Sequence, residues 1–197
     1  KRESLPVLFL HLKAPPQSYL HMYRRLQDTL LHGQSYPSKA RVDASRICIT
    51  GRSSGGLTVL CALIQYPDIF CAASSSYGIS DLKSLSQHTH KYELHYTTTL
   101  MGGTYEDLPG VYKARSALHH ADKIRTPLLL LQGDQDRVVA PDQSRRMARA
   151  IESHAGKIKY IEFPSEGHGF RRSDTRQRAL EEEFAWCNDA ARIPEVC

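Results

Sequence analysis

The sequence has no apolar run long enough to cross a bilayer. The longest ones, residues 7–10 and 128–131, are far shorter than the roughly 20 residues that a membrane helix needs. The first residues also lack the charged, apolar and small-residue order of a secretory leader. We therefore expect no membrane association, and we interpret the short apolar runs as buried strands.

Paired cysteines are also missing, because none of the five has the C-x-x-C spacing of a metal or redox site. Cys48, Cys61 and Cys71 lie in apolar segments, where a free thiol packs as a small hydrophobic group. This usage favours a reducing compartment, so we expect a cytoplasmic protein. No H-E-x-x-H motif accompanies the ten histidines, and we predict neither a metal nor another cofactor.

Basic residues exceed acidic ones, which gives a formal net charge of +5. They are scattered, however, with short pairs only, and no basic stripe with interleaved aromatic residues accompanies them. We attribute the charge to a solvated surface and expect no nucleic-acid partner. The pattern indicates no particular oligomeric state.

Strand and helix patterns alternate from residue 41 onward. We expect strands at residues 46–50, 70–75, 127–131 and 157–163, and helices at residues 54–66, 141–153 and 174–186. Such alternation predicts an α/β protein with a mostly parallel sheet and helices on both faces. Ligands of such sheets bind beyond the carboxyl ends of the strands.

The apolar positions of each helix predict its buried face. We expect inward faces made of Leu57, Leu60, Cys61 and Ile64, then Met147, Ala148 and Ile151, and finally Leu180, Phe184 and Ala185. Between residues 78 and 120 the regular alternation of strand and helix patterns is absent. Short helical patterns at 81–86 and 92–100 are expected to break at 102–103 and 109–110.

One serine has the sequence context of an enzyme nucleophile. Residues 51–55, G-R-S-S-G, match G-x-S-x-G between a predicted strand and a predicted helix. This strand–turn–helix pushes the serine of an α/β hydrolase above the sheet, so Ser53 is the candidate nucleophile. The backbone N–H of Ser54 would face the developing oxyanion. The alternative is a glycine-rich phosphate turn, but neither G-x-G-x-x-G nor G-K-[ST] is present.

A serine nucleophile needs an imidazole base and a carboxylate behind it, in the chain order Ser, acid, His. His168 alone among the histidines follows a late strand in a glycine-flanked loop. Asp134, Asp136 and Asp142 compete as the acid. Asp142 better suits the first turn of a helix, and periodicity does not decide between the other two.

Three motifs in this order resemble the catalytic domain of the prolyl oligopeptidase family, in its acylaminoacyl-peptidase or dipeptidyl-peptidase-like branch. They are G-R-S-S-G-G at 51–56, G-D-Q-D-R-V-V at 133–139 and E-G-H-G-F at 166–170. The likeness covers about residues 41–186. The family acid is the Asp of G-x-x-D, so the resemblance selects Asp136. It also implies a serine peptidase that cleaves short peptides through an acyl-enzyme.

The resemblance weakens near the N-terminus. Residues 12–15, L-K-A-P, stand where the family has an H-G-G-P-like turn that supplies a second oxyanion donor. We expect one α/β-hydrolase domain over residues 1–197, with a catalytic core at 41–190. Residues 1–40 would form an irregular, truncated portion, with a strand at 5–11, a helix at 18–31 and some strands missing. The family's β-propeller is not expected in this sequence.

The leading hypothesis is therefore a peptidase whose triad is Ser53, Asp136 and His168, without a cofactor. Tyr77, Tyr92 and Tyr96 are candidates for its substrate pocket. A carboxylesterase is the second hypothesis, because the same triad hydrolyses esters. A catalytically silent remnant is the third, motivated by the N-terminal departures.

Overall fold

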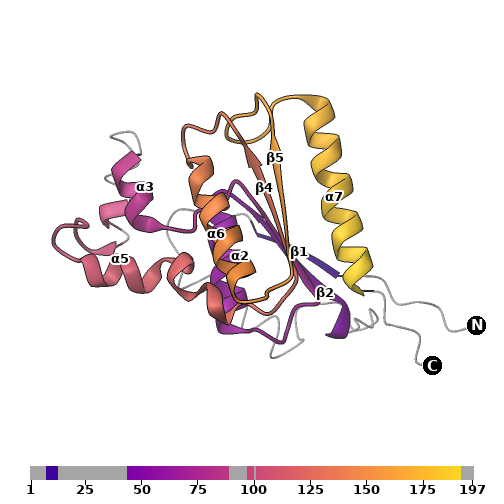
Figure 1. The fold of residues 1–197 in the computed structure, drawn as a ribbon, viewed down its shortest axis with the longest axis horizontal. Helices are drawn as coiled ribbons and strands as arrows, with labels where there is room; N and C mark the ends of the chain where they lie inside the picture. The colour runs from indigo at the N-terminus through magenta and orange to yellow at the C-terminus, as the bar shows by residue number, and fades with distance from the viewer. Residues whose placement is uncertain (1–7, 13–43, 89–96, 100, 192–197) are drawn as a thin grey trace, which may run out of the picture.

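The computed structural model describes residues 8–12, 44–88, 97–99 and 101–191 of the chain (Figure 1). The expected helix at 18–31 lies outside these residues. Within them, no helix combines the length and the apolar character that spanning a membrane requires.

Five parallel strands form one sheet, and their order in the sheet is their order in the sequence. They are β1 (Leu8–Leu12), β2 (Ile47–Arg52), β3 (Ala72–Ser76), β4 (Leu128–Gly133) and β5 (Ile158–Phe163). The predicted strands are confirmed, with ends shifted by no more than three residues. Since all strands are parallel, the turns after β2, β4 and β5 meet at one edge of the sheet.

Helices cover both faces of this sheet, as predicted (Figure 1). The longer ones are α2 (Ser54–Gln65), α6 (Pro141–Ser153) and α7 (Ser173–Ala191). Because α2 and α6 connect neighbouring parallel strands, right-handed crossovers place both on the same face. Helix α7 follows β5 and leads to no further described strand. It packs on the opposite face of the sheet.

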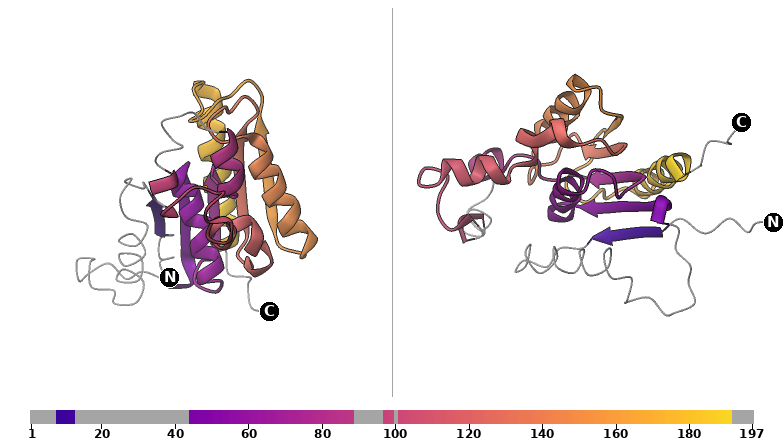
Figure 2. Two further views of the ribbon diagram at one scale, coloured as in Figure 1. Left: turned by 90° about the vertical axis from the view of Figure 1, so that its left-hand side faces the viewer. Right: turned by 90° about the horizontal axis from the view of Figure 1, so that it is seen from below.

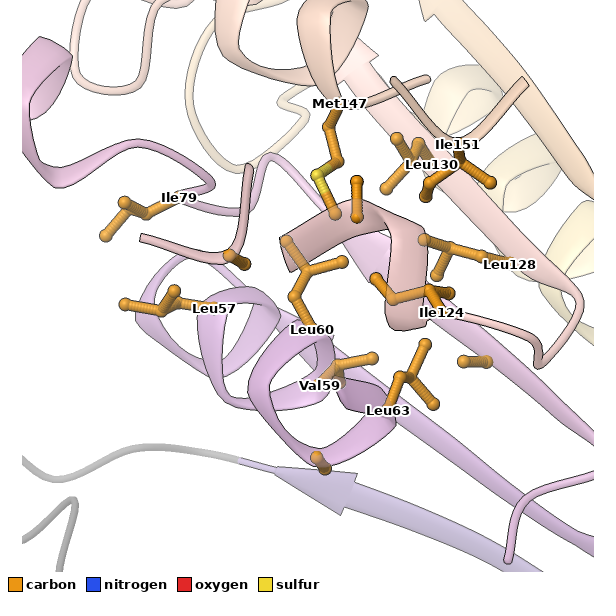
Figure 3. Packing of buried hydrophobic residues seen from close by; sticks show 14 of the residues in the cluster. Leu57, Val59, Leu60, Leu63, Ile79, Ile124, Leu128, Leu130, Met147 and Ile151 are labelled. Carbon is orange, nitrogen blue, oxygen red and sulfur yellow. The ribbon is translucent and has the colours of Figure 1, made fainter. Parts of the chain in front are cut away.

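The main core lies between the sheet and the pair α2 and α6 (Figure 3). Leu60 and Leu63 of α2 pack with Met147 of α6 and with Leu128 and Leu130 of β4, and all five are buried. The alternate strand residues Leu129 and Leu131 face the other way, into a second cluster with α7. Each fully buried side chain of this size contributes about 1.5–3 kcal/mol.

The predicted inward face of α2 is only partly correct. Leu57 and Leu60 are buried, but Cys61 and Ile64 are half-buried, whereas Val59 and Leu63 are buried as well. The helix contacts β1, β2, β3 and the 3-10 segment η2 (Ala117–Lys123), so it is covered on most of its circumference.

The predicted inward face of α7 is wrong. Leu180 and Phe184 are 54% and 61% exposed, and Ala185 is exposed too. The face against the sheet instead carries small residues that are four or eight positions apart: Thr175, Ala179, Cys187 and Ala191. Small side chains let the helix axis approach the strands, and hydrophobicity alone does not identify such a face.

An excursion between β3 and β4 carries α3 (Leu82–His88) and α5 (Pro109–Arg115) to one side of the molecule (Figure 2). Helix α3 confirms the pattern at 81–86, whereas most of 92–100 lies outside the described residues. The predicted break at 109–110 is wrong, because Pro109 is the first residue of α5. The first turn of a helix needs no N–H from that residue, so proline fits there.

Candidate active site

Ser53 lies at the sharp turn between β2 and α2. Its backbone has φ 54°, in the left-handed region that ordinary residues rarely adopt, and its N–H donates to the carbonyl oxygen of Ser76 at 3.0 Å. A side chain at Gly51 would strike the backbone carbonyl of Gly55, so only glycine allows the chain to pass this closely. The strained turn lifts the Ser53 hydroxyl beyond the end of β2.

His168 joins this hydroxyl to a carboxylate from another loop. Its Nε2 lies 2.8 Å from Ser53 Oγ, and its Nδ1 lies 2.9 Å from Asp136 Oδ2. An ionised carboxylate only accepts hydrogen bonds, so Nδ1 carries the ring proton in the neutral imidazole. The lone pair of Nε2 is then directed at the Ser53 hydroxyl, which is the arrangement a general base requires.

The Asp136 carboxylate is fully buried and has four donors. The N–H groups of Val138 and Val139 donate to its Oδ1, each at 2.9 Å. Its Oδ2 accepts from His168 and, at 3.0 Å, from Gln132. Burial by itself raises the pKa of Asp136, but the hydrogen bonds from His168 and the backbone outweigh it and hold the pKa below its ordinary value. The acid is therefore kept ionised.

The other two candidate acids are placed elsewhere. Asp134 is half-buried, and its Oδ1 has no hydrogen-bond partner among the described residues. Asp142 lies in the first turn of α6 with an exposed side chain, 3.9 Å from Arg146. Of the three carboxylates, only that of Asp136 contacts His168.

Ser54 is the first residue of α2, so its N–H belongs to the helix end that carries partial positive charge. The first N–H groups of a helix have no acceptor within the helix. In the sheet, the last residue of β1, Leu12, pairs with Gly51 of β2, two residues before Ser53. The rest of the L-K-A-P segment at 12–15, which stands in place of the family turn, lies outside the described residues.

Tyr77, a candidate pocket residue, is buried and packs against the imidazole of His168. Its ring centroid is 4.8 Å from that of His168 and 5.0 Å from that of Phe170, both in edge-on contacts, and the residue is only 8% exposed. Its burial raises the pKa of the Tyr77 hydroxyl. The other two pocket candidates, Tyr92 and Tyr96, lie outside the described residues.

Two buried polar side chains support the site and were not identified from the sequence. Gln132, at the end of β4, contacts the Asp136 carboxylate. Glu166 accepts from the N–H groups of Arg171 and Arg172 at 2.7 and 3.0 Å, which closes the loop that carries His168. Burial alone raises the pKa of Glu166, but these hydrogen bonds outweigh it and lower that pKa. The available signals were the position of Gln132 directly after the apolar run 128–131 and that of Glu166 in the E-G-H-G-F motif.

Two other histidines make local contacts. His120 Nε2 lies 3.0 Å from the carbonyl oxygen of Ala114, and His154 Nδ1 lies 2.8 Å from that of Ala150 at the end of α6. Across the described part of the chain, no three His, Cys, Asp or Glu side chains gather so that they could hold a metal ion.

Known proteins resemble this chain over most of its length. The family model described as the prolyl oligopeptidase family matches residues 21–193. Dipeptidyl peptidase family member 6 of Caenorhabditis elegans is 31% identical over 140 residues, which is 68% of this chain and 19% of that protein. Dipeptidyl aminopeptidase BIII of Pseudoxanthomonas mexicana is 30% identical over 158 residues, which is 78% of this chain and 23% of that protein.

A solved structure is similar to this chain in both sequence and fold. A puromycin-hydrolyzing peptidase of Mycobacterium tuberculosis has a TM-score of 0.75 and 38% identity, over 86% of this chain and 24% of that one. With the strand–turn–helix at Ser53, this likeness identifies the α/β-hydrolase fold that the sequence predicts. The chain spans about a fifth of the length of the curated relatives that it matches.

Proposed function

This chain belongs to the prolyl oligopeptidase family, and from that premise we propose that it is the catalytic part of a serine peptidase that cleaves short peptides. One observation carries the proposal. The His168 ring contacts the Ser53 hydroxyl with one nitrogen and the Asp136 carboxylate with the other, at 2.8 and 2.9 Å. Three separate loops supply these groups, and core packing alone does not require their convergence.

In the first half of the reaction, Ser53 Oγ attacks the carbonyl carbon of the scissile bond. As the new C–O bond forms, the hydroxyl proton moves to His168 Nε2, and the carbonyl electron pair moves onto its oxygen. The N–H of Ser54 stabilises this oxyanion. When the tetrahedral intermediate collapses, the C–N bond breaks and the leaving amine takes the proton from Nε2, which leaves an ester of Ser53.

In the second half, water repeats the attack on this ester. Nε2 of His168 accepts a proton from the water and returns it to Ser53 Oγ as the acid product leaves. In both halves, the ionised Asp136 accepts a hydrogen bond from His168 Nδ1–H and stabilises the imidazolium that forms. The lowered pKa of Asp136 supports this role, because the carboxylate stays charged at neutral pH.

Covalent labelling tests the nucleophile. The purified 197-residue chain is mixed with a fluorophosphonate and its intact mass is measured. We expect one adduct, and we expect Ser53→Ala to abolish it. Ser54→Ala is the matched control, because its proposed contribution comes from the backbone N–H and survives the substitution. A folded wild-type chain that takes up no adduct would refute the proposal and favour the silent remnant.

Matched substrates test the reaction class. We propose amides as the natural substrates, and puromycin is one suitable test compound because the similar peptidase of Mycobacterium tuberculosis is described as hydrolysing it. A short peptide amide and the ester of the same acyl group are compared by kcat/KM. Hydrolysis of the ester with no turnover of any amide would replace the peptidase with the carboxylesterase hypothesis.

A further inference from the structure

Gln132 is a fully buried amide at the carboxyl end of β4, beside the proposed triad. It is 0% exposed, and its Nε2 donates to Asp136 Oδ2 at 3.0 Å. That oxygen is the one that accepts from His168 Nδ1. We propose that Gln132 is a positioning residue, which holds Asp136 Oδ2 in line with the imidazole. This inference rests on the proposed function, since it concerns the same triad.

The surroundings of Gln132 fix which way its amide points. Nε2 faces three acceptors: Asp136 Oδ2, the carbonyl oxygen of Val139 at 3.3 Å and that of Gly133 at 3.3 Å. A flipped amide would place its own oxygen against all three. On the other side, Oε1 accepts from the Ser144 hydroxyl of α6 at 2.8 Å. The amide is therefore held in a single orientation, with its donor toward the carboxylate.

The hydrogen bonds of Asp136 show why such a donor matters. Oδ1 is held by two backbone N–H groups, those of Val138 and Val139. Among the described residues Oδ2 has two donors, Gln132 and the His168 ring that it must orient. Without Gln132, the ring itself would be the one described donor left at Oδ2, and rotation about Cβ–Cγ would be restrained mainly from the Oδ1 side. Gln132 supplies a contact that does not depend on the position of the imidazole.

The contact also connects the site to the body of the fold. Gln132 is on a central strand, and Ser144 is on the first turns of α6, and both are buried. Neighbouring Gln143 of α6 accepts from the N–H groups of Ser80 and Asp81 at 2.8 and 3.0 Å, and so contacts a different loop. These two buried glutamines therefore form a matched pair, of which only Gln132 contacts the triad.

The test replaces each glutamine with methionine, which has nearly the same volume and no polar hydrogen. Both variants lose buried hydrogen bonds, so both are expected to melt at lower temperature than the wild type. For Gln132→Met we expect kcat to fall about 10- to 100-fold while KM changes little, because one donor to a charged group is lost. Gln143→Met is expected to keep the wild-type kcat and KM.

A second readout does not depend on activity. In ¹⁵N-histidine-labelled protein, the Nδ1 proton of His168 that is bonded to Asp136 is followed by NMR. We expect its signal to persist in the wild type and in Gln143→Met, and to broaden or vanish in Gln132→Met. If Gln132→Met kept both this signal and the kcat of Gln143→Met, the positioning role would be refuted. An inactive, unlabelled wild type that nevertheless shows this difference between the variants would refute the proposed function alone.

Discussion

Replacing Asp136 with Asn perturbs the site without changing its shape. In the folded chain the carboxylate accepts four hydrogen bonds, two at each oxygen, and it is fully buried. An Asn side chain has one acceptor oxygen only, so its NH₂ group must face two donors at one of these positions. Two hydrogen bonds are lost and a buried donor is left unpaired, which we expect to cost about 2–5 kcal/mol of unfolding free energy.

The same change disturbs the imidazole of His168. If the Asn NH₂ faces Nδ1, that nitrogen must accept, and the ring proton moves to Nε2. Nε2 can then no longer take the proton of Ser53 Oγ. In serine proteases the corresponding substitution lowers kcat about 10⁴-fold, and we expect a loss of that order here.

The two effects are measured by urea unfolding and by the rate of fluorophosphonate labelling. Asp134→Asn is the control, with an expected stability change below about 1 kcal/mol and nearly full labelling, since Asp134 has no contact with His168. Because the folded pKa of Asp136 is lowered, its contribution to stability is present above about pH 4 and is lost as pH falls through the lower folded value. The stability gap between wild type and Asp136→Asn should therefore narrow in acid. Equal damage from Asp134→Asn, or a gap that widens in acid, would refute the reasoning.

Three further predictions concern the supporting structure. Gly51→Ala forces a methyl group against the backbone of α2 and is expected to lower the unfolding free energy by more than about 3 kcal/mol. Gly110→Ala, where an added methyl group meets nothing within 4 Å, is the near-neutral control. Similar melting temperatures of the two variants would contradict this. Leu180→Gln is expected to change the unfolding free energy by less than about 0.5 kcal/mol, against about 2–5 kcal/mol for Leu63→Ala. Comparable urea midpoints would mean that this face of α7 is covered in solution. Glu166→Ala leaves the backbone N–H groups of Arg171 and Arg172 without their acceptor, which is expected to lower the unfolding free energy by about 2–4 kcal/mol and to slow fluorophosphonate labelling. Unchanged labelling would argue against a role of Glu166 in holding the loop of His168.

The strands and the three longer described helices could be predicted because their patterns are strong. The apolar run at 128–131 has the length of a buried strand and lies between Pro127 and Gly133, and α6 begins and ends at the predicted residues. The candidate site residues could also be selected from the sequence, since the turn at Ser53 and the loop at His168 each follow a strand. The structure places both beside Asp136, at the edge where parallel strands end.

Other features depend on tertiary contacts that a pattern does not contain. The buried face of α7 consists of small residues such as Ala179, which are only weakly hydrophobic, whereas the bulky Leu180 and Phe184 are mostly exposed. Similarly, Gln132 looks like the polar end of an apolar strand. Its importance comes from Asp136, four residues later, and from Ser144 on the next helix.

The single helix on the second face of the sheet has a consequence for biosynthesis. The crossover helices cover one face as each strand is added, but Leu129 and Leu131 point to the face that only α7 covers among the described elements. A ribosome makes about 5–20 residues per second, so this apolar surface stays open for on the order of a few seconds after β5 is complete. During that interval the exposed surface can promote aggregation or the binding of a chaperone.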